Sequence, residues 1–121
     1  LEMIGLRIGD AKILRTPGAH LTDDALTGVI VGVHLLQVRR VLVVPHTRCA
    51  VASGTDADVA AAIKESSGVD VGGLHIGADP DQEGHLRRDV ARLREHPLIA
   101  GRADIGGFLY DVDTGGLRQL L

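Results

Sequence analysis

Aromatic residues are almost absent from this sequence. It has one phenylalanine, one tyrosine and no tryptophan in 121 residues, so valine, isoleucine, leucine and alanine must build the hydrophobic core. The charged residues are mixed in sign, with a net charge of −3 and no block of basic residues. Proteins that bind nucleic acids usually combine a basic surface with aromatic side chains that stack on bases. The composition therefore argues against a nucleic-acid partner.

Two further absences concern the cellular compartment. No apolar run approaches the roughly 20 residues that span a membrane, and residues 1–6 show no basic region or cleavage pattern of a signal peptide. The single cysteine cannot form an internal disulfide bond, which is typical of proteins in reducing compartments. We therefore expect a cytoplasmic protein that does not associate with membranes. Because the first residue is leucine, we also expect residues upstream of Leu1 in the native protein.

Strand and helix patterns alternate along the chain. Helices are expected from Thr22 to about Leu36, from Gly54 to about Gly68 and from Asp79 to His96. Strands are expected at residues 11–15, 40–44, 105–112 and 117–121. This alternation predicts an α/β fold with a mostly parallel sheet of about four strands flanked by helices, and with a C-terminal antiparallel edge strand. The length fits a single domain over residues 1–121.

A histidine and the only cysteine follow the end of a hydrophobic strand. The run Val41–Val44 stops at Pro45, and His46 and Cys49 come directly after it. In open α/β sheets, ligands bind at the carboxyl ends of strands, and imidazole and thiolate are ligands that zinc prefers. On spacing alone, a buried cysteine and a hydrogen-bonded loop histidine explain the pair as well as a metal site does.

Arg15 lies at the end of the first expected strand, beside the Pro17-Gly18 turn. A guanidinium in this position can attract a small anion. An ion pair with Asp10 or Asp24 explains it equally well. The remaining histidines have no cysteine nearby and are expected at the surface or in helix packing: His20, His34, His75, His85 and His96.

Several segments, in this order and spacing, resemble the β-class carbonic anhydrases over essentially the whole chain. In the first half the resembling segments are Gly9–Arg15, Pro17-Gly18, Thr22–Asp24, Val41–Val44 and His46–Cys49. In the second half they are His96–Ile99, Gly107–Val112 and Thr114-Gly115.

The resemblance implies a zinc enzyme, a lyase that interconverts carbon dioxide and bicarbonate and works as a homodimer or larger assembly. In that family zinc is held by two cysteines and one histidine, and His46 and Cys49 match two of these ligands. The other cysteine belongs to a Cys-x-Asp-x-Arg motif just before the segment that matches residues 1–6. Its Asp and Arg form the catalytic dyad, so no catalytic residue is expected within this sequence and an N-terminal segment is expected to be missing. The family's active-site turn corresponds to Arg15 and Gly18, which are the expected substrate-binding residues.

This sequence also departs from the family pattern. The family usually has Arg-Asn-Ala-Gly where Arg15-Thr16-Pro17-Gly18 stands, and glycine where Ala50 stands. Two alternatives follow: a carbonic-anhydrase-like scaffold or binding protein with impaired catalysis, or a hydrolase of a related small substrate such as carbonyl sulfide or carbon disulfide. A different α/β nucleotide-binding module is a weaker alternative, because no glycine-rich strand-to-helix fingerprint is present.

Overall fold

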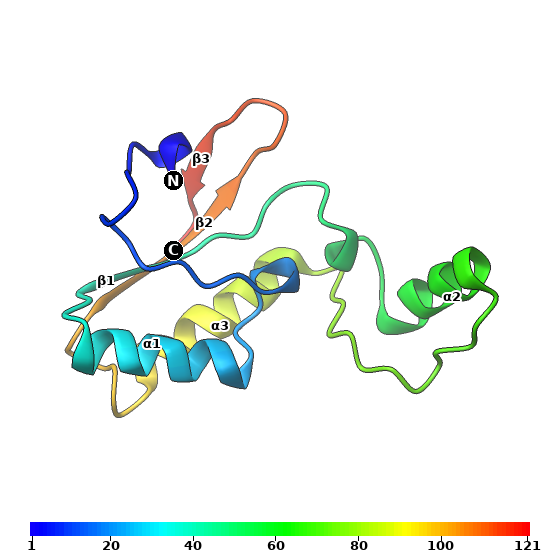
Figure 1. Ribbon diagram of the computed structural model, residues 1–121, viewed down its shortest axis with the longest axis horizontal. Coiled ribbons are helices and arrows are strands. Elements are labelled where there is room, and N and C mark those ends of the chain that lie inside the picture. The colour runs from blue at the N-terminus through cyan, green and yellow to red at the C-terminus, as the bar shows by residue number, and fades with distance from the viewer.

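The computed structural model describes residues 1–121 and contains a three-stranded sheet (Figure 1). The strands β1 (Arg40–Val43), β2 (Asp104–Tyr110) and β3 (Leu117–Gln119) lie in the order β1-β2-β3. Strand β1 pairs in parallel with β2, and β2 pairs antiparallel with β3. The expected α/β class and the C-terminal antiparallel edge strand are confirmed.

Three α-helices form where the sequence places them: α1 (Asp23–Leu35), α2 (Asp56–Ser67) and α3 (Gln82–Glu95). Short 3-10 turns lie at η1 (Glu2–Ile4), η2 (Pro17–Ala19) and η3 (Ala50–Ala52). The Thr22 hydroxyl caps α1 and the Asp81 carboxylate caps α3, each by accepting a backbone N–H of the first turn. Helix α3 ends before Pro97, whose ring disfavours a helical conformation in the preceding residue. None of these helices has the length and hydrophobicity needed to cross a membrane.

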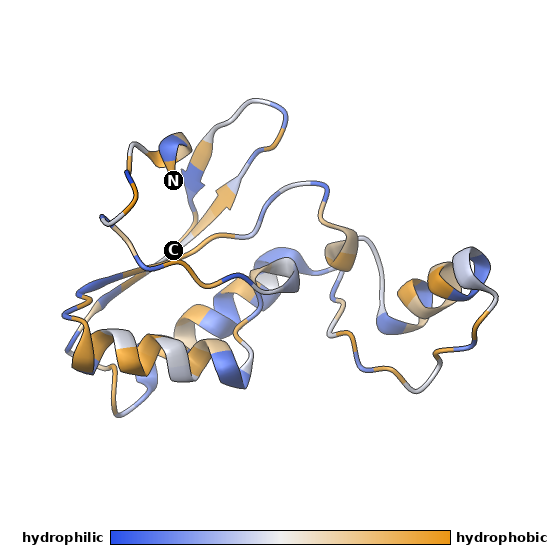
Figure 2. Cartoon of the chain, viewed as in Figure 1, coloured by the Kyte–Doolittle hydropathy of each residue, from blue (hydrophilic) through white to orange (hydrophobic).

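The hydrophobic core lies between α3 and the sheet. Its buried members are Leu86, Val90, Leu93, Ile99 and Ile105. Residues of α1 and β1 pack around this cluster: Leu26, Val29, Ile30, Val41 and Val43. Helices α1 and α3 therefore cover the same face of the sheet, and apolar residues run along α1 in Figure 2. Because side chains alternate along a strand, Leu42 points away from this core and is 45% exposed.

The prediction of a strand at residues 11–15 is wrong, and the sheet has three strands where about four were expected. None of the backbone groups of residues 11–15 makes a backbone hydrogen bond, and a strand requires a hydrogen-bonding partner. The side chain of Leu14 instead lies on α1, where a Cβ on Gly28 would come within 2.7 Å of Leu14 Cδ1. The outer edge of β1 is also unpaired, because β1 ends the strand order.

Helix α2 lies apart from the sheet, at one end of the longest axis of the molecule (Figure 1). No residue of α2 belongs to the hydrophobic core or packs against it. A capping box holds the start of the helix: the Asp58 N–H donates to Thr55 Oγ1 at 3.3 Å, and the Thr55 N–H donates to Asp58 Oδ2 at 2.9 Å. Since most helix stability normally comes from tertiary packing, we expect α2 to depend strongly on this cap.

Replacing Thr55 with alanine should destabilise α2 by about 1 kcal/mol, because the hydroxyl that accepts the Asp58 N–H is lost. Amide hydrogen exchange in residues 56–67 should then be roughly fivefold faster, because about 1 kcal/mol changes an opening equilibrium by roughly that factor. Thr27→Ala is the control, because the Thr27 hydroxyl donates to the Asp23 carbonyl within α1 and caps nothing. Unchanged exchange of α2 in Thr55→Ala would contradict a helix that depends on its cap.

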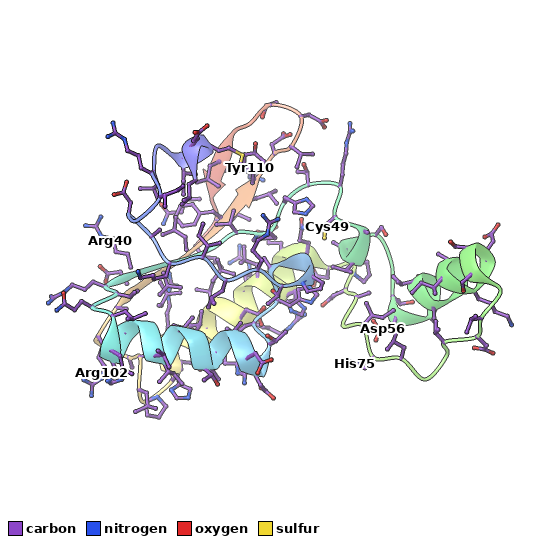
Figure 3. All side chains as sticks on the ribbon, viewed as in Figure 1. Arg40, Cys49, Asp56, His75, Arg102 and Tyr110 are labelled. Atoms are coloured by element: carbon purple, nitrogen blue, oxygen red, sulfur yellow. The ribbon has the colours of Figure 1, made fainter.

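Asp56 attaches the segment after α2 to the start of the helix. Its carboxylate accepts the N–H of Ala78 at 2.6 Å and the N–H of Ile76 at 3.2 Å. His75 Nδ1 lies 3.4 Å from Asp56 Oδ2, and both residues are labelled at this junction in Figure 3. The backbone N–H of Ala78, more than any other group, lowers the pKa of Asp56. The carboxylate form is therefore the one that holds this segment in place.

The attachment should depend on pH in a defined direction. Because the pKa of Asp56 is lower in the folded protein than its ordinary value of about 3.9, the attachment is fully present above that value. It is lost as the pH falls through the lowered pKa. The NMR chemical shift of the Ala78 amide should follow this titration and stop doing so in Asp56→Asn, while Asp24→Asn should leave it unchanged. A midpoint at or above the ordinary carboxyl value would contradict the prediction.

Candidate functional site

The loop that follows β1 is fixed to the end of β2. The Pro45 carbonyl accepts the N–H of Tyr110, and the Thr47 N–H donates to the Tyr110 carbonyl, both at 2.9 Å. The Thr47 hydroxyl accepts the N–H of Val112 at 3.0 Å. Since Pro45 is buried and has no N–H to extend the ladder, β1 ends before it. The loop therefore lies at the carboxyl ends of the two parallel strands.

His46 is exposed in this loop, with one ring nitrogen engaged. Its Nδ1 lies 2.6 Å from the carbonyl oxygen of Thr47. A carbonyl can only accept, so Nδ1 carries a hydrogen, and in the neutral ring Nε2 then keeps a free lone pair. The His46 carbonyl accepts the side-chain amide of Gln82, at the start of α3, at 2.8 Å. The ring is thus held in the tautomer that can bind a metal through Nε2.

Cys49 is a free cysteine with 8% of its surface exposed, at the residue that precedes η3 (Figure 3). Arg48, which directly precedes Cys49, adopts a positive φ of 56°, which is uncommon for a residue other than glycine. The Arg48 guanidinium forms an ion pair with Asp113 at 3.0 Å. The tight turn before Cys49 is therefore attached to the turn between β2 and β3.

Gly18 and Arg15 lie in different surroundings. Gly18 has a φ of 69°, and a Cβ there would come within 2.6 Å of Val51 Cγ2. Since Val51 stands two positions after Cys49 in the sequence, the Gly18 turn packs beside the cysteine segment, and only glycine fits. Arg15 is exposed and forms no ion pair, so neither Asp10 nor Asp24 neutralises it.

A cluster of two histidines and two aspartates lies beside the Gly18 turn. The rings of His20 and His85 stack with their centroids 3.8 Å apart. His85 Nδ1 lies 3.2 Å from Asp79 Oδ2, and His85 Nε2 lies 3.2 Å from Asp89 Oδ2. Burial and then the charge of His85 lower the pKa of His20, and the N–H of Asp81 is the largest cause of the lowered pKa of Asp79.

The sequence pattern does not reveal this cluster, because its members come from separate segments. The spacing of His85 and Asp89, four residues apart on one helix, was the only local signal. His20, His85 and Asp89 of this cluster line a cavity of about 10 Å³ together with Gly18 and Pro45, which has room for roughly one water molecule. The cluster therefore joins the Gly18 turn to α3 behind the candidate site.

No three histidine, cysteine, aspartate or glutamate side chains gather closely enough to hold a metal ion. The nitrogen of His46 and the sulfur of Cys49 are donors of the kind that zinc prefers, but catalytic zinc sites have three protein ligands. The donor types therefore fit zinc, and the pair would supply two of the three protein ligands that such a site needs.

The comparisons with known proteins agree with one another, although no protein-family model matches the chain. The crystal structure of a carbonic anhydrase from Streptococcus mutans is 34% identical with a TM-score of 0.86, and the match covers 99% of this chain and 72% of that one. β-Carbonic anhydrase 1 of Mycobacterium tuberculosis is 28% identical over 119 residues, covering 98% of this chain and 72% of that protein.

A carbon disulfide hydrolase of Acidithiobacillus thiooxidans is also similar, with 27% identity over 137 residues that cover 97% of this chain and 68% of that protein. The similarity in fold to a solved carbonic anhydrase and the similarity in sequence to a curated one each cover nearly the whole chain. The chain therefore belongs to the β-carbonic anhydrase family of enzymes.

Proposed function

We propose that this protein catalyses the zinc-dependent, reversible hydration of carbon dioxide to bicarbonate, with His46 and Cys49 as two of the zinc ligands. The observation that carries the proposal is the position of these two donors, at the carboxyl ends of parallel strands in a β-carbonic anhydrase fold. The Nε2 lone pair of His46 and the buried thiol of Cys49 support the same assignment.

The third ligand and the Asp/Arg dyad are proposed to come from a Cys-x-Asp-x-Arg segment upstream of Leu1. Two unpaired backbone edges support this part of the proposal: residues 11–15 and the outer edge of β1. Unpaired edges of this kind accept an additional strand. Residues 1–121 would then form most of a single domain that this segment completes.

Zinc, when bound, supplies the Lewis acidity that lowers the pKa of water to about 7 and so provides a nucleophile at neutral pH. The residues of this chain bind the metal and arrange the substrate. Arg15 is exposed and unneutralised, so its guanidinium is free to attract bicarbonate. Gly18 lets its turn approach the cysteine segment, where any larger residue would collide with Val51.

A second candidate is the hydrolysis of carbonyl sulfide or carbon disulfide. The similarity to carbon disulfide hydrolases favours it, and so does the altered turn at Thr16 and Pro17. The Thr16 hydroxyl donates to the His20 carbonyl at 2.7 Å, and Pro17 has no N–H to offer. This turn therefore presents fewer hydrogen-bond donors to a polar product than an Asn-Ala pair would.

The experiment is a comparison of substrates on the full-length protein loaded with zinc. Stopped-flow measurement should show hydration of carbon dioxide well above the uncatalysed rate, with little release of hydrogen sulfide from carbon disulfide or carbonyl sulfide. Release of hydrogen sulfide without hydration of carbon dioxide would contradict the first proposal and support the second candidate. Zinc binding without turnover of any of these substrates would favour a scaffold that has lost catalysis.

We also propose a cytoplasmic homodimer. The free cysteine is compatible with a reducing compartment, and the exposed side chains of Val69 and Leu74 beside α2 offer apolar surface for a second copy. Light scattering coupled to size-exclusion chromatography should give twice the mass of the chain, and the mass of a single chain would contradict the dimer.

A further inference from the structure

A basic hollow lies at the end of the sheet opposite to the His46 loop. Its volume is about 530 Å³, and its lining residues are Arg39, Arg94, Gly101, Arg102, Ala103, Asp104 and Ile105. A volume of this size suits a small ligand. The hollow is at the amino-terminal ends of the parallel strands, since Arg40 of β1 pairs with Asp104 of β2. Figure 3 shows Arg40 and Arg102 at this end, away from Cys49.

The arginines of the hollow are not neutralised by the protein. Arg39, Arg94 and Arg102 have no carboxylate within 4.0 Å, whereas Arg48, Arg87, Arg88 and Arg92 each form an ion pair. Three arginines therefore line a hollow that has one acidic residue, Asp104, among its lining residues. This concentration of positive charge stands out in a chain whose net charge is −3.

The backbone around the hollow is held in place before any ligand arrives. Arg94 donates from Nε and Nη2 to the Ile105 carbonyl at 3.2 and 2.6 Å, so Nη1 remains free. The Arg39 carbonyl accepts the N–H of Asp104, and the Arg102 N–H donates to the Ile99 carbonyl, both at 2.9 Å. The Arg94 guanidinium is therefore held in position, and a preorganised donor lowers the entropy that binding costs.

We propose that this hollow binds a phosphate group of a small molecule. A phosphate carries a charge of roughly −1.5 to −2 at neutral pH, which matches the excess of positive charge in the hollow. The planar fork of a guanidinium also pairs with phosphate oxygens through two hydrogen bonds. The site is separate from the proposed zinc ligands and does not depend on them.

Arg39 and Arg102 are the residues that test the site. Arg94 stands in the last turn of α3, where a cation is also stabilised by the helix dipole, and it contacts the Ile105 carbonyl, so its loss would affect folding. Arg39 and Arg102 lie outside the helices, and neither charge has a structural partner. The matched control is Arg7→Gln with Arg118→Gln, which removes the same charge from two exposed arginines outside the hollow.

The experiment titrates the full-length protein with inorganic phosphate and pyrophosphate at physiological salt, followed by NMR shifts of the Gly101, Arg102 and Ala103 amides. Saturable shifts should appear at these amides, and pyrophosphate should bind more tightly than phosphate. Arg39→Gln with Arg102→Gln should weaken binding at least tenfold, because two charged hydrogen-bonding groups are lost. The control pair should weaken it less than twofold. Circular dichroism and thermal unfolding verify that both double variants fold.

Three results would overturn the proposal. The first is the absence of saturable shifts at these amides at millimolar phosphate or pyrophosphate. The second is equal weakening in the control pair, since this would show attraction by net charge alone. The third is equal affinity for nitrate, a planar monoanion, because the charge of the hollow would then not select phosphate.

Discussion

Replacing Cys49 with serine, or His46 with glutamine, should abolish stable zinc binding and reduce carbon dioxide hydration by more than about 100-fold. Loss of a residue that merely orients a ligand costs 10- to 100-fold in affinity or activity by usual experience, and the loss of a ligand itself should exceed this. A serine hydroxyl is a far weaker ligand than a thiolate. Zinc content by mass spectrometry and stopped-flow hydration measure the two effects on the full-length protein.

His75→Gln is the matched control, because the His75 side chain is 91% exposed and lies beside α2. It should retain zinc and activity at the level of the unaltered protein. Addition of zinc should also raise the thermal midpoint of the unaltered protein but not of the Cys49 variant, since metal binding stabilises the folded state. Full zinc content in both Cys49→Ser and His46→Gln would remove these residues from the site.

Replacing Leu93 with alanine should cost about 3 kcal/mol of the free energy of unfolding, within the range of roughly 2 to 5 kcal/mol for such changes. Leu93 is completely buried, and it belongs to the cluster that joins α3 to Ile99 and Ile105. Truncation leaves a cavity that a densely packed core cannot fill. Urea unfolding followed by circular dichroism gives the difference between the variants.

Leu98→Ala is the matched control, because it makes the same chemical change at a residue that is 45% exposed. It should cost less than about 0.5 kcal/mol, as surface substitutions usually do. The midpoint of thermal unfolding should fall by about 10 °C in the Leu93 variant and hardly change in the control. Similar losses in the two variants would show that the core is not centred on α3.

The helices were predictable because their signals are local. A side-chain oxygen before each helix accepts a backbone N–H from the first turn of that helix; the capping residues are Thr22, Thr55 and Asp81. At the other end of α2, Gly68 ends the helix with a positive φ of 74°. The composition of residues 11–15 also suits a strand, yet these residues form none. Strand formation depends on a partner elsewhere in the chain, which a local pattern does not specify.

The difference between local signals and contacts between distant segments also decides which candidate sites the sequence reveals. His46 and Cys49 are close in sequence and follow a strand, so their pattern was visible before the structure. The His20–His85 stack and the basic hollow were not, because their residues come from distant segments that only the fold brings together. Arg39, Arg94 and Arg102, for instance, lie before β1, at the end of α3 and in the turn before β2.

The most direct test of the zinc assignment is X-ray absorption at the zinc edge on the full-length protein. We expect nitrogen at about 2.0 to 2.1 Å and sulfur at about 2.3 Å from the metal, with one sulfur lost in Cys49→Ser. Because this chain has a single cysteine, a sulfur that remains in Cys49→Ser would show that another cysteine of the full-length protein binds the metal. A protein that retains no zinc, or a metal surrounded only by nitrogen and oxygen, would contradict the proposed site.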